Sequence, residues 1–326
     1  MILAGDIGGT NARLALFDVE DGRLSLFSAT VFPSHQYAGL DQIVAEFIET
    51  SNVRPDQACF GVAGPVRNGR VETSNLPWIV ESERLANELE IGKVFLINDL
   101  EANAWGIVDL DLKDAVTLNQ GKEIPGNQAV IAAGTGLGEA GMYWDGAHHQ
   151  VFASEGGHTD FAPRNELEIE LFRHLSVKFG RVSYERILSG PGLVNVFNFL
   201  RDTGRGSEPQ WLIEQMQSSD PAAAISQAAM GGSCPLCEQA IDIFVSVYAA
   251  EAGNLALKMM ATGGVFLGGG IAPKILSKLS QPSFMPAFVT KGRMQPLLES
   301  IPVKVITNDK ISLLGAARCA MVKSAN

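Results

Sequence analysis

Runs of basic residues are absent from this chain. Its 326 residues include 25 lysines and arginines against 36 aspartates and glutamates, which gives a formal net charge of −11. A nucleic-acid-binding surface requires clustered Lys and Arg. The composition therefore argues against nucleic acid as a partner and favours small-molecule substrates.

An uninterrupted membrane-spanning segment is also lacking. The longest apolar stretch, NLALKMMATGGVFLGGGIA, is interrupted by Lys258 and by several glycines. The N-terminus has an aspartate at position 6 and no basic region of the kind that opens a signal peptide. We therefore expect a cytoplasmic protein without a membrane partner.

Cysteine is scarce, with four residues in the whole chain. Without a signal peptide these residues are expected to be free thiols. Cys234 and Cys237 form a C-x-x-C pair, which could be half of a zinc site or a redox couple. No second pair and no nearby His-x-His completes such a site, and a long apolar helix follows. We therefore interpret the pair as two cysteines at a helix N-terminus.

Of two common nucleotide-binding signatures, one is missing and the other lacks its structural context. No G-x-x-x-x-G-K-[ST] motif occurs, which excludes a P-loop. Gly136, Gly138 and Gly141 do spell G-x-G-x-x-G after an apolar run. However, the segment that follows, MYWDGAHHQVF, lacks the helix that a dinucleotide-binding motif requires.

The residues that are present predict an α/β protein of about two domains, since one domain usually takes roughly 100 to 200 residues. Residues 1–32 form three strand-like runs with turns at Gly8-Gly9 and Asp21-Gly22. Residues 39–52 have the apolar spacing of an amphipathic helix. A strand, a helix and a second strand then lead to Asn98-Asp99.

A second block repeats this design near residue 130. AVIAAGTGLGEAGMYWDG is an apolar strand, a Gly/Thr turn at residues 134–138 and another strand-like run. The repeat indicates a duplicated lobe. The remainder is mostly helical, apart from strands at GVFLGGG and PVKVIT.

Both turns have the composition of a phosphate-binding loop. Glycine lets consecutive backbone N–H groups approach an anion, and Thr10 and Thr135 add hydroxyl donors. Asp6, at the end of the first strand, is placed to hold Mg²⁺ through water. Glycine-rich hairpins also occur as simple tight turns, but two similar loops favour phosphate binding.

Six segments along nearly the whole chain closely resemble the bacterial ATP-dependent glucokinases, which belong to the superfamily of sugar kinases, heat-shock ATPases and actin. They are GDIGGTNARLALFD, INDLEANAWG, AAGTGLG, EGGHTDFAP, SYERILSGPG and GGGIAPKI. The resemblance implies two duplicated ribonuclease H-like lobes with a central cleft. It also implies ATP-dependent phosphorylation of D-glucose to glucose 6-phosphate, the first step of glycolysis, with Mg²⁺.

The small lobe is expected to take residues 1–110 plus the C-terminal helix 311–326, and the large lobe residues 111–310. The resemblance places phosphates at the first and second turns and adenosine at a third glycine cluster. The nucleotide-binding residues so implied are Gly5, Asp6, Ile7, Gly8, Gly9, Thr10, Asn11, Gly134, Thr135, Gly136, Gly138, Gly268, Gly269 and Gly270. A homodimer is an expectation by analogy alone.

Asp99 is the candidate catalytic residue, because phosphorylation of a hydroxyl needs a proton acceptor. It follows a buried strand, and Asn98 beside it can hydrogen-bond a neighbouring sugar hydroxyl. Such a pair also often caps a helix, and the two roles are compatible. The glucokinase resemblance favours catalysis.

Glu155 and His158 lie in EGGH, a spacing that would suit two metal ligands on one helix face. The two glycines between them disfavour a helix, which leaves hexose recognition or a structural turn. A carboxylate can accept from two adjacent hydroxyls, and an imidazole offers one donor or acceptor. Glu185, which rests mainly on the resemblance, and Asn75 are further candidates for sugar binding.

One departure concerns zinc. Related sugar kinases and repressors carry a cysteine-rich zinc motif shortly after the GH element, whereas residues 159–184 contain no cysteine. No structural zinc is therefore expected.

The alternative function is a sugar-sensing regulator of the same fold without turnover. Such proteins usually have a DNA-binding segment before the first strand, whereas here the first strand starts at Ile2. A third possibility, a chaperone-like ATPase, would need a peptide-binding domain, and the two expected lobes leave no residues for one.

Overall fold

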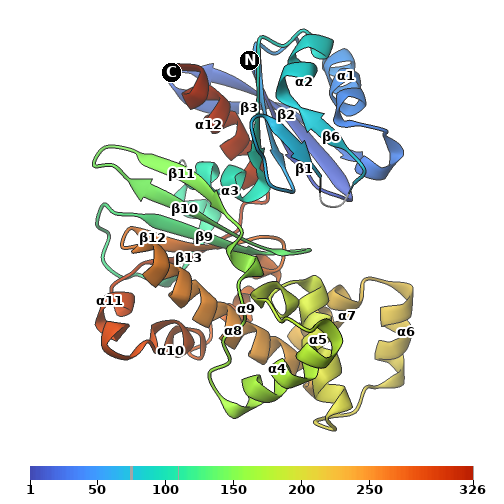
Figure 1. The fold of residues 1–326 in the computed structure, drawn as a ribbon, viewed down its shortest axis with the longest axis vertical. Coiled ribbons are helices and arrows are strands. Elements are labelled where there is room, and N and C mark those ends of the chain that lie inside the picture. The colour runs from blue at the N-terminus through green and yellow to red at the C-terminus, as the bar shows by residue number, and fades with distance from the viewer. Residues whose placement is uncertain (74–75, 109, 326) are drawn as a thin grey trace. The chain divides into compact units, whose positions relative to one another are not determined.

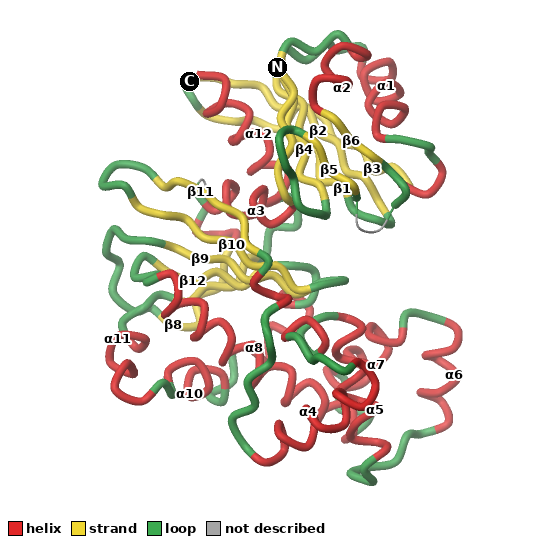
Figure 2. The backbone as a smooth tube through the Cα atoms, viewed as in Figure 1, coloured by secondary structure: helices red, strands yellow, loops and turns green. Residues whose placement is uncertain are grey.

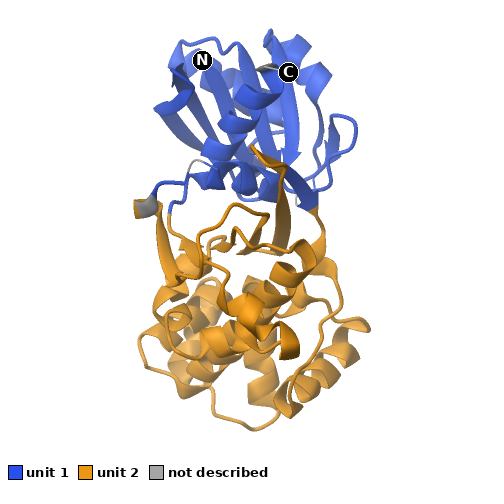
Figure 3. Cartoon of the chain, turned by 90° about the vertical axis from the view of Figure 1, so that its left-hand side faces the viewer, with its two compact units in different colours: residues 1–111, 151–153, 308–326 blue, residues 112–150, 154–307 orange. Residues whose placement is uncertain are grey.

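The structure is a computed structural model that describes residues 1–73, 76–108 and 110–325. The chain divides into two compact units, which are coloured separately in Figure 3. Unit 1 comprises residues 1–111, 151–153 and 308–326, and unit 2 comprises residues 112–150 and 154–307. Each unit contains a mixed β-sheet of its own.

The sheet of unit 1 has five strands in the order β3-β2-β1-β4-β7, of which β1, β2 and β3 are labelled in Figure 1. The first three strands form the antiparallel meander that the sequence predicts, and β4 and β7 extend it in parallel. An unexpected two-stranded ribbon, β5 and β6, lies outside this sheet. The bounds are β1 (Ile2–Ile7), β2 (Asn11–Glu20), β3 (Arg23–Pro33), β4 (Gln57–Val62), β5 (Arg70–Glu72), β6 (Ile79–Glu81) and β7 (Lys93–Asn98).

Helices cover both faces of this sheet. Alternate residues of a strand point to opposite faces, and in β1 Leu3 packs in the core with α1 and α2 whereas Ile2 packs in the core with α3 and α12. The amphipathic spacing expected for residues 39–52 is confirmed, because α1 buries its apolar stripe in the first core. The bounds are α1 (Leu40–Ser51), α2 (Ser82–Leu89), α3 (Asp99–Ile107) and α12 (Ile311–Ala325).

Two glycines let α3 and α12 pack closely. A Cβ atom added at Gly315 would lie 1.8 Å from the carbonyl oxygen of Ala102, and one added at Gly106 would lie 2.3 Å from that of Ile311. Backbone atoms cannot be displaced as a flexible side chain can. The contact therefore depends on the absence of side chains at both positions.

The second sheet belongs to unit 2 apart from residues 151–153 of its edge strand β11, and its six strands have the order β11-β10-β9-β12-β13-β8. β10 is antiparallel to β9, and β9, β12 and β13 are parallel. The succession β10-β9-β12-β13 thus has the same pairing as β2-β1-β4-β7. The bounds are β8 (Ala115–Asn119), β9 (Gln128–Ala133), β10 (Leu137–Trp144), β11 (His149–Ser154), β12 (Gly264–Gly268) and β13 (Val303–Ile306). β8 and β11 are not expected from the sequence.

Unit 2 contains helices α4 to α11, and Figure 2 draws the helices in red. The longest, α8, is apolar and long enough to cross a membrane, but 78% of its most apolar window is buried inside the protein. It is therefore a core helix of unit 2. The bounds are α4 (Glu166–Phe179), α5 (Gly190–Asp202), α6 (Gln210–Ser218), α7 (Pro221–Met230), α8 (Pro235–Met259), α9 (Leu276–Leu279), α10 (Phe284–Val289) and α11 (Gln295–Glu299).

All four cysteines are buried free thiols. Cys234 is the N-cap of α8 and Cys237 lies in its first turn, as predicted. Among the residues that the structure describes, no three His, Cys, Asp or Glu side chains are grouped closely enough to hold a metal ion.

We expect Gly315→Ala to destabilise unit 1. A methyl group close to the Ala102 carbonyl would force α3 and α12 apart, at a cost of up to about 3 kcal/mol. This cost exceeds the gain of about 1 kcal/mol in helix propensity. Chemical unfolding of the purified variant measures the difference.

Gly231→Ala is the matched control. Gly231 has a φ of −83° at the end of α7, and an added Cβ atom would meet no atom closer than 3.3 Å. The control should change the free energy of unfolding by less than about 0.5 kcal/mol. Equal stability of both variants would contradict the close-packing argument.

Candidate active site

The carboxyl ends of three parallel strands meet at one edge of the unit 1 sheet. Ile7, Val62 and Asn98 are in register at the ends of β1, β4 and β7. Ligands in open α/β sheets bind at this kind of edge. The glycine turn after β1 and the Asn98-Asp99 pair after β7 are thereby brought to the same side of unit 1.

The turn between β1 and β2 is held by hydrogen bonds that leave its threonine exposed. The Gly8 N–H donates to the carbonyl of Asn11 at 3.0 Å. Ser34 donates its hydroxyl to the Gly8 carbonyl at 2.9 Å and its N–H to that of Thr10 at 3.0 Å. The observed turn is shorter than the predicted nucleotide-binding segment of residues 5–11, because residues 5–7 belong to β1 and Asn11 begins β2.

Asp6 lies in β1 opposite Arg13 of β2. Burial raises the pKa of the Asp6 carboxyl, and this effect outweighs the nearby Arg13 charge and a hydrogen bond from Ser312, which both lower it. A cation beside the carboxylate would offset the cost of burial. A carboxylate oxygen also suits Mg²⁺, which prefers hard oxygen ligands and retains several waters.

Asn98 caps helix α3. Its Oδ1 accepts the Leu100 N–H at 2.9 Å, and its Nδ2 donates to the Gly64 carbonyl at 3.2 Å. Asp99 is the first residue of the helix and is partly buried. The Leu100 N–H also lies 2.9 Å from Asp99 Oδ1. The cap is therefore provided by Asn98, and a carboxylate at the position of Asp99 is stabilised by the helix dipole.

The turn between β9 and β10 in unit 2 comprises residues 134–136. The Gly134 N–H donates to the Gly136 carbonyl at 2.9 Å, and Thr135 is exposed. The Gly134 carbonyl accepts the N–H of Gly190, the first residue of α5, at 2.8 Å. The expected turn at 134–138 is too long, because Gly138 pairs with Ala132 inside the β-sheet.

The third glycine cluster lies beside this turn. Gly268 ends β12 in register with Ala132 of β9. Gly269 has a φ of +80°, and a Cβ atom there would lie 2.3 Å from the carbonyl oxygen of Ala133. Gly270 is exposed. Two of the three predicted nucleotide-binding segments are therefore adjacent within unit 2.

Three predicted sugar-binding side chains also come together in unit 2. His158 Nε2 lies 3.9 Å from Glu155 Oε2, and His158 Nδ1 lies 3.8 Å from Glu185 Oε1. They are carried by two short 3-10 turns, η3 (Gly156–His158) and η4 (Tyr184–Arg186). The expected absence of an α-helix at EGGH is confirmed, since η3 is a single turn.

Glu185 connects the sugar-binding group to the glycine turn. Its Oε2 accepts the N–H of Leu137, the first residue of β10, at 3.0 Å. A Cβ atom at Gly136 would lie 2.5 Å from the same oxygen. The two predicted sites of unit 2 are therefore contiguous, which the sequence does not indicate.

Several supporting residues are not identified by the sequence. Arg13 could have been found, because it faces Asp6 across a hairpin whose turn is predicted. Ser34 and Ser312 lie far from their partners along the chain and carry no local signal. Asn75, a predicted sugar contact, lies outside the described residues.

A family model for glucokinase matches residues 3–323 of the chain. The chain belongs to the glucokinase family. The resemblance seen in the sequence is thereby confirmed. The chain is a kinase that phosphorylates glucose.

Glucokinases from Nostoc sp. and from Trichormus variabilis are each 43% identical to the chain over 337 residues, covering 98% of both proteins. The crystal structure of a glucokinase from an Antarctic psychrotroph has a TM-score of 0.85 and 32% identity, with 98% of each chain covered. A ROK family glucokinase from Streptomyces griseus, solved in complex with glucose and AMPPNP, shares the fold with a TM-score of 0.68 at 20% identity, covering 98% of this chain and 99% of that one.

We expect Asn98→Ala to reduce stability by more than Asp99→Asn, which loses only the interaction of its charge with the helix dipole. The first variant loses the cap of α3, worth about 1 kcal/mol, and a hydrogen bond to Gly64 worth about 1 kcal/mol. The second variant keeps the cap on Asn98. Urea unfolding of both variants tests this division, and a larger loss from Asp99→Asn would assign the cap to Asp99.

Proposed function

We propose that this glucokinase family member transfers the terminal phosphoryl group of Mg-ATP to the 6-hydroxyl of D-glucose. The observation that carries the proposal is the convergence of Glu155, His158 and Glu185 beside the Gly134–Gly136 turn. The bound glucose and ATP analogue of the Streptomyces griseus structure support the same pair of substrates.

The glycine turns are proposed to bind the nucleotide. The turn after β1 (residues 8–10) and the turn of residues 134–136 would contact the β- and γ-phosphates through backbone N–H groups and through the hydroxyls of Thr10 and Thr135. The positive end of α5, which begins beside Gly134, favours an anion there. Residues 268–270 would support the adenosine.

Asp6 is proposed to hold Mg²⁺ through water, since it supplies a single carboxylate and Mg²⁺ retains several waters. When bound, the ion would neutralise charge on the phosphates. The role of this chain is to supply a carboxylate whose burial disfavours ionisation without a cation nearby. Arg13 and Ser312 keep that carboxylate in place.

The two units are proposed to be duplicated ribonuclease H-like lobes with a central cleft. The equivalent pairing of β2-β1-β4-β7 and β10-β9-β12-β13 supports duplication. We assign residues 1–110 and 311–326 to the small lobe and residues 111–310 to the large lobe. The division of the chain into two compact units supports this assignment, except that residues 111, 151–153 and 308–310 group with the small lobe.

Asp99 is proposed to accept the proton of the 6-hydroxyl as that oxygen attacks the γ-phosphorus in line and ADP leaves. Asn98 retains one amide hydrogen for a sugar hydroxyl, because the other donates to Gly64. Closure of the lobes would exclude water, which would otherwise compete with glucose as the acceptor.

A sugar-sensing regulator without turnover is the less supported alternative, because the matching family model and the curated relatives are glucokinases. A cytoplasmic location is part of the proposal, and burial of the apolar helix α8 supports it. Homodimer formation stays a prediction.

We expect Asp99→Asn to lower kcat by a factor on the order of 10² or more, because it removes the proton acceptor but keeps the shape of the side chain. Glucose binding should be largely retained. Coupled detection of glucose-dependent ADP release measures turnover. Near-normal kcat in a folded variant would refute the catalytic role.

We expect Glu155→Gln to raise the KM for glucose about tenfold to a hundredfold, since a charge-assisted hydrogen bond is worth roughly 1.5 to 3 kcal/mol. The KM for ATP should change far less. Because Asp99 is assigned to the 6-hydroxyl, we place Glu155, His158 and Glu185 towards the anomeric end of the sugar, and a comparison of glucose with 1-deoxyglucose tests that contact. Discrimination as strong in variants of all three residues as in the unaltered enzyme would mean that the sugar binds in the reverse orientation or that EGGH is only a structural turn.

A further inference from the structure

Glu139 is a buried carboxyl group that the proposed mechanism does not use. It lies in β10, two residues after Leu137, with 1% of its surface exposed. Within the part of the chain that the structure describes, its Oε1 has no hydrogen-bond partner. A buried polar atom in this position calls for a functional explanation.

The carboxyl group of Glu139 lies directly against the turn that carries Glu155 and His158. A Cβ atom added at Gly156 would lie 1.9 Å from Glu139 Oε2, and one added at Gly157 would lie 2.0 Å from the carbonyl oxygen of Leu137. Both glycines of EGGH are therefore required by close contact with β10. The position of η3 depends on these contacts.

We propose that Glu139 is a positioning residue for glucose, because its buried side chain supports Gly156 and so sets the positions of Glu155 and His158. This inference rests on the proposed function, in which those two side chains contact the sugar. Glu139 itself is not proposed to touch glucose.

The electrostatic surroundings make this support dependent on pH. Burial, and next the charge of Glu251, raise the pKa of Glu139 to about 7, although Lys258 opposes the shift. These two charged groups and Tyr248 lie on α8. The η3 turn, which also lies against Glu139, carries Glu155 and His158, whose side chains are 60% and 54% exposed.

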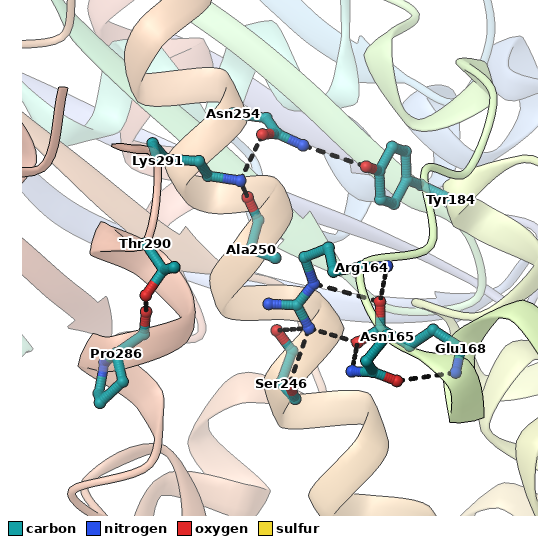
Figure 4. Close-up of polar contacts among 10 residues, drawn as sticks. All are labelled: Arg164, Asn165, Glu168, Tyr184, Ser246, Ala250, Asn254, Pro286, Thr290 and Lys291. Atoms are coloured by element: carbon teal, nitrogen blue, oxygen red, sulfur yellow. Dashed lines mark hydrogen bonds and ion pairs between the residues drawn. The ribbon is translucent and has the colours of Figure 1, made fainter. Parts of the chain in front are cut away.

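Glu251 belongs to a network that also reaches the second sugar-binding turn. Asn254 Nδ2 donates to Glu251 Oε2 at 2.7 Å and to the Tyr184 hydroxyl at 3.0 Å. Figure 4 shows the bond to Tyr184 and, on the other side of Asn254, Lys291, which also donates to the Ala250 carbonyl. Since Tyr184 precedes Glu185, α8 supports one turn while Glu139 supports the other.

The direction of the pH effect follows from the location of Glu139. Below about pH 7 the group is neutral and tolerates burial beneath Gly156. Above that pH it ionises next to Glu251, and a buried carboxylate whose Oε1 lacks a hydrogen-bond partner among the described residues favours displacement of the turn towards water. Glucose affinity should therefore fall as the pH rises from 6 to 8.

The test compares Glu139→Gln with the unaltered enzyme. In the unaltered enzyme, the KM for glucose should rise by up to about tenfold between pH 6 and 8, because the neutral fraction of Glu139 falls by about that factor. In the variant, which stays neutral, it should change by less than about twofold. The KM for ATP should have the same pH profile in both proteins.

Glu168→Gln is the matched control, because Glu168 is also a buried glutamate of unit 2 but is paired with Arg164 (Figure 4). It should retain the pH dependence of the unaltered enzyme. A glucose KM profile that is unchanged by Glu139→Gln would overturn the proposal. Absence of glucose phosphorylation by the unaltered enzyme would instead refute the proposed function.

Thermal unfolding provides a readout that does not require activity. The raised pKa means that between about pH 4.5 and about pH 7 Glu139 is ionised in the unfolded chain but still protonated in the native state, so stability falls as the pH rises through this range. Glu139→Gln should therefore be more stable than the unaltered enzyme at pH 8 by a larger margin than at pH 5. An equal margin at both pH values would contradict burial of an ionising carboxyl group.

Discussion

The hydrogen bond from the Leu137 N–H to Glu185 is the interaction around which unit 2 arranges its candidate site. It attaches the η4 turn to the first residue of β10, immediately after the glycine turn. The carbonyl of the same residue lies against Gly157 of η3. One strand end thereby fixes three segments that are far apart in the sequence. A shift of β10 would move the proposed phosphate and sugar contacts together.

Local patterns account for the elements that the sequence predicts. The β-meander follows from apolar runs separated by Gly and Asp-Gly turns, and α1 follows from its apolar spacing. The place of Asp99 could also be predicted, because an abrupt change from apolar to polar residues marks the end of β7. The absence of a helix after Gly141 correctly argued against a dinucleotide-binding motif, since β10 occupies that segment.

The remaining features depend on contacts between distant residues. Gly138 has the composition of a turn residue, but pairing with Ala132 places it in a strand. Likewise, the sequence indicates only that the two glycines of EGGH disfavour a helix, whereas in the structure Leu137 and Glu139 leave no room for side chains there. Pairing register and close packing are set by the whole sheet, and no local pattern of EGGH or AGTGLG encodes them.

The position of α12 affects the order in which the chain can fold. Ala317 and Cys319 of this helix share a core with Ile2 and Cys59, although the whole of unit 2 lies between them along the chain. During synthesis, the sheet of unit 1 therefore emerges from the ribosome with one face lacking α12. Long-range contacts of this kind form late, and an exposed apolar face favours aggregation. This core of unit 1 is therefore complete only once α12 has been synthesised and has packed against the sheet.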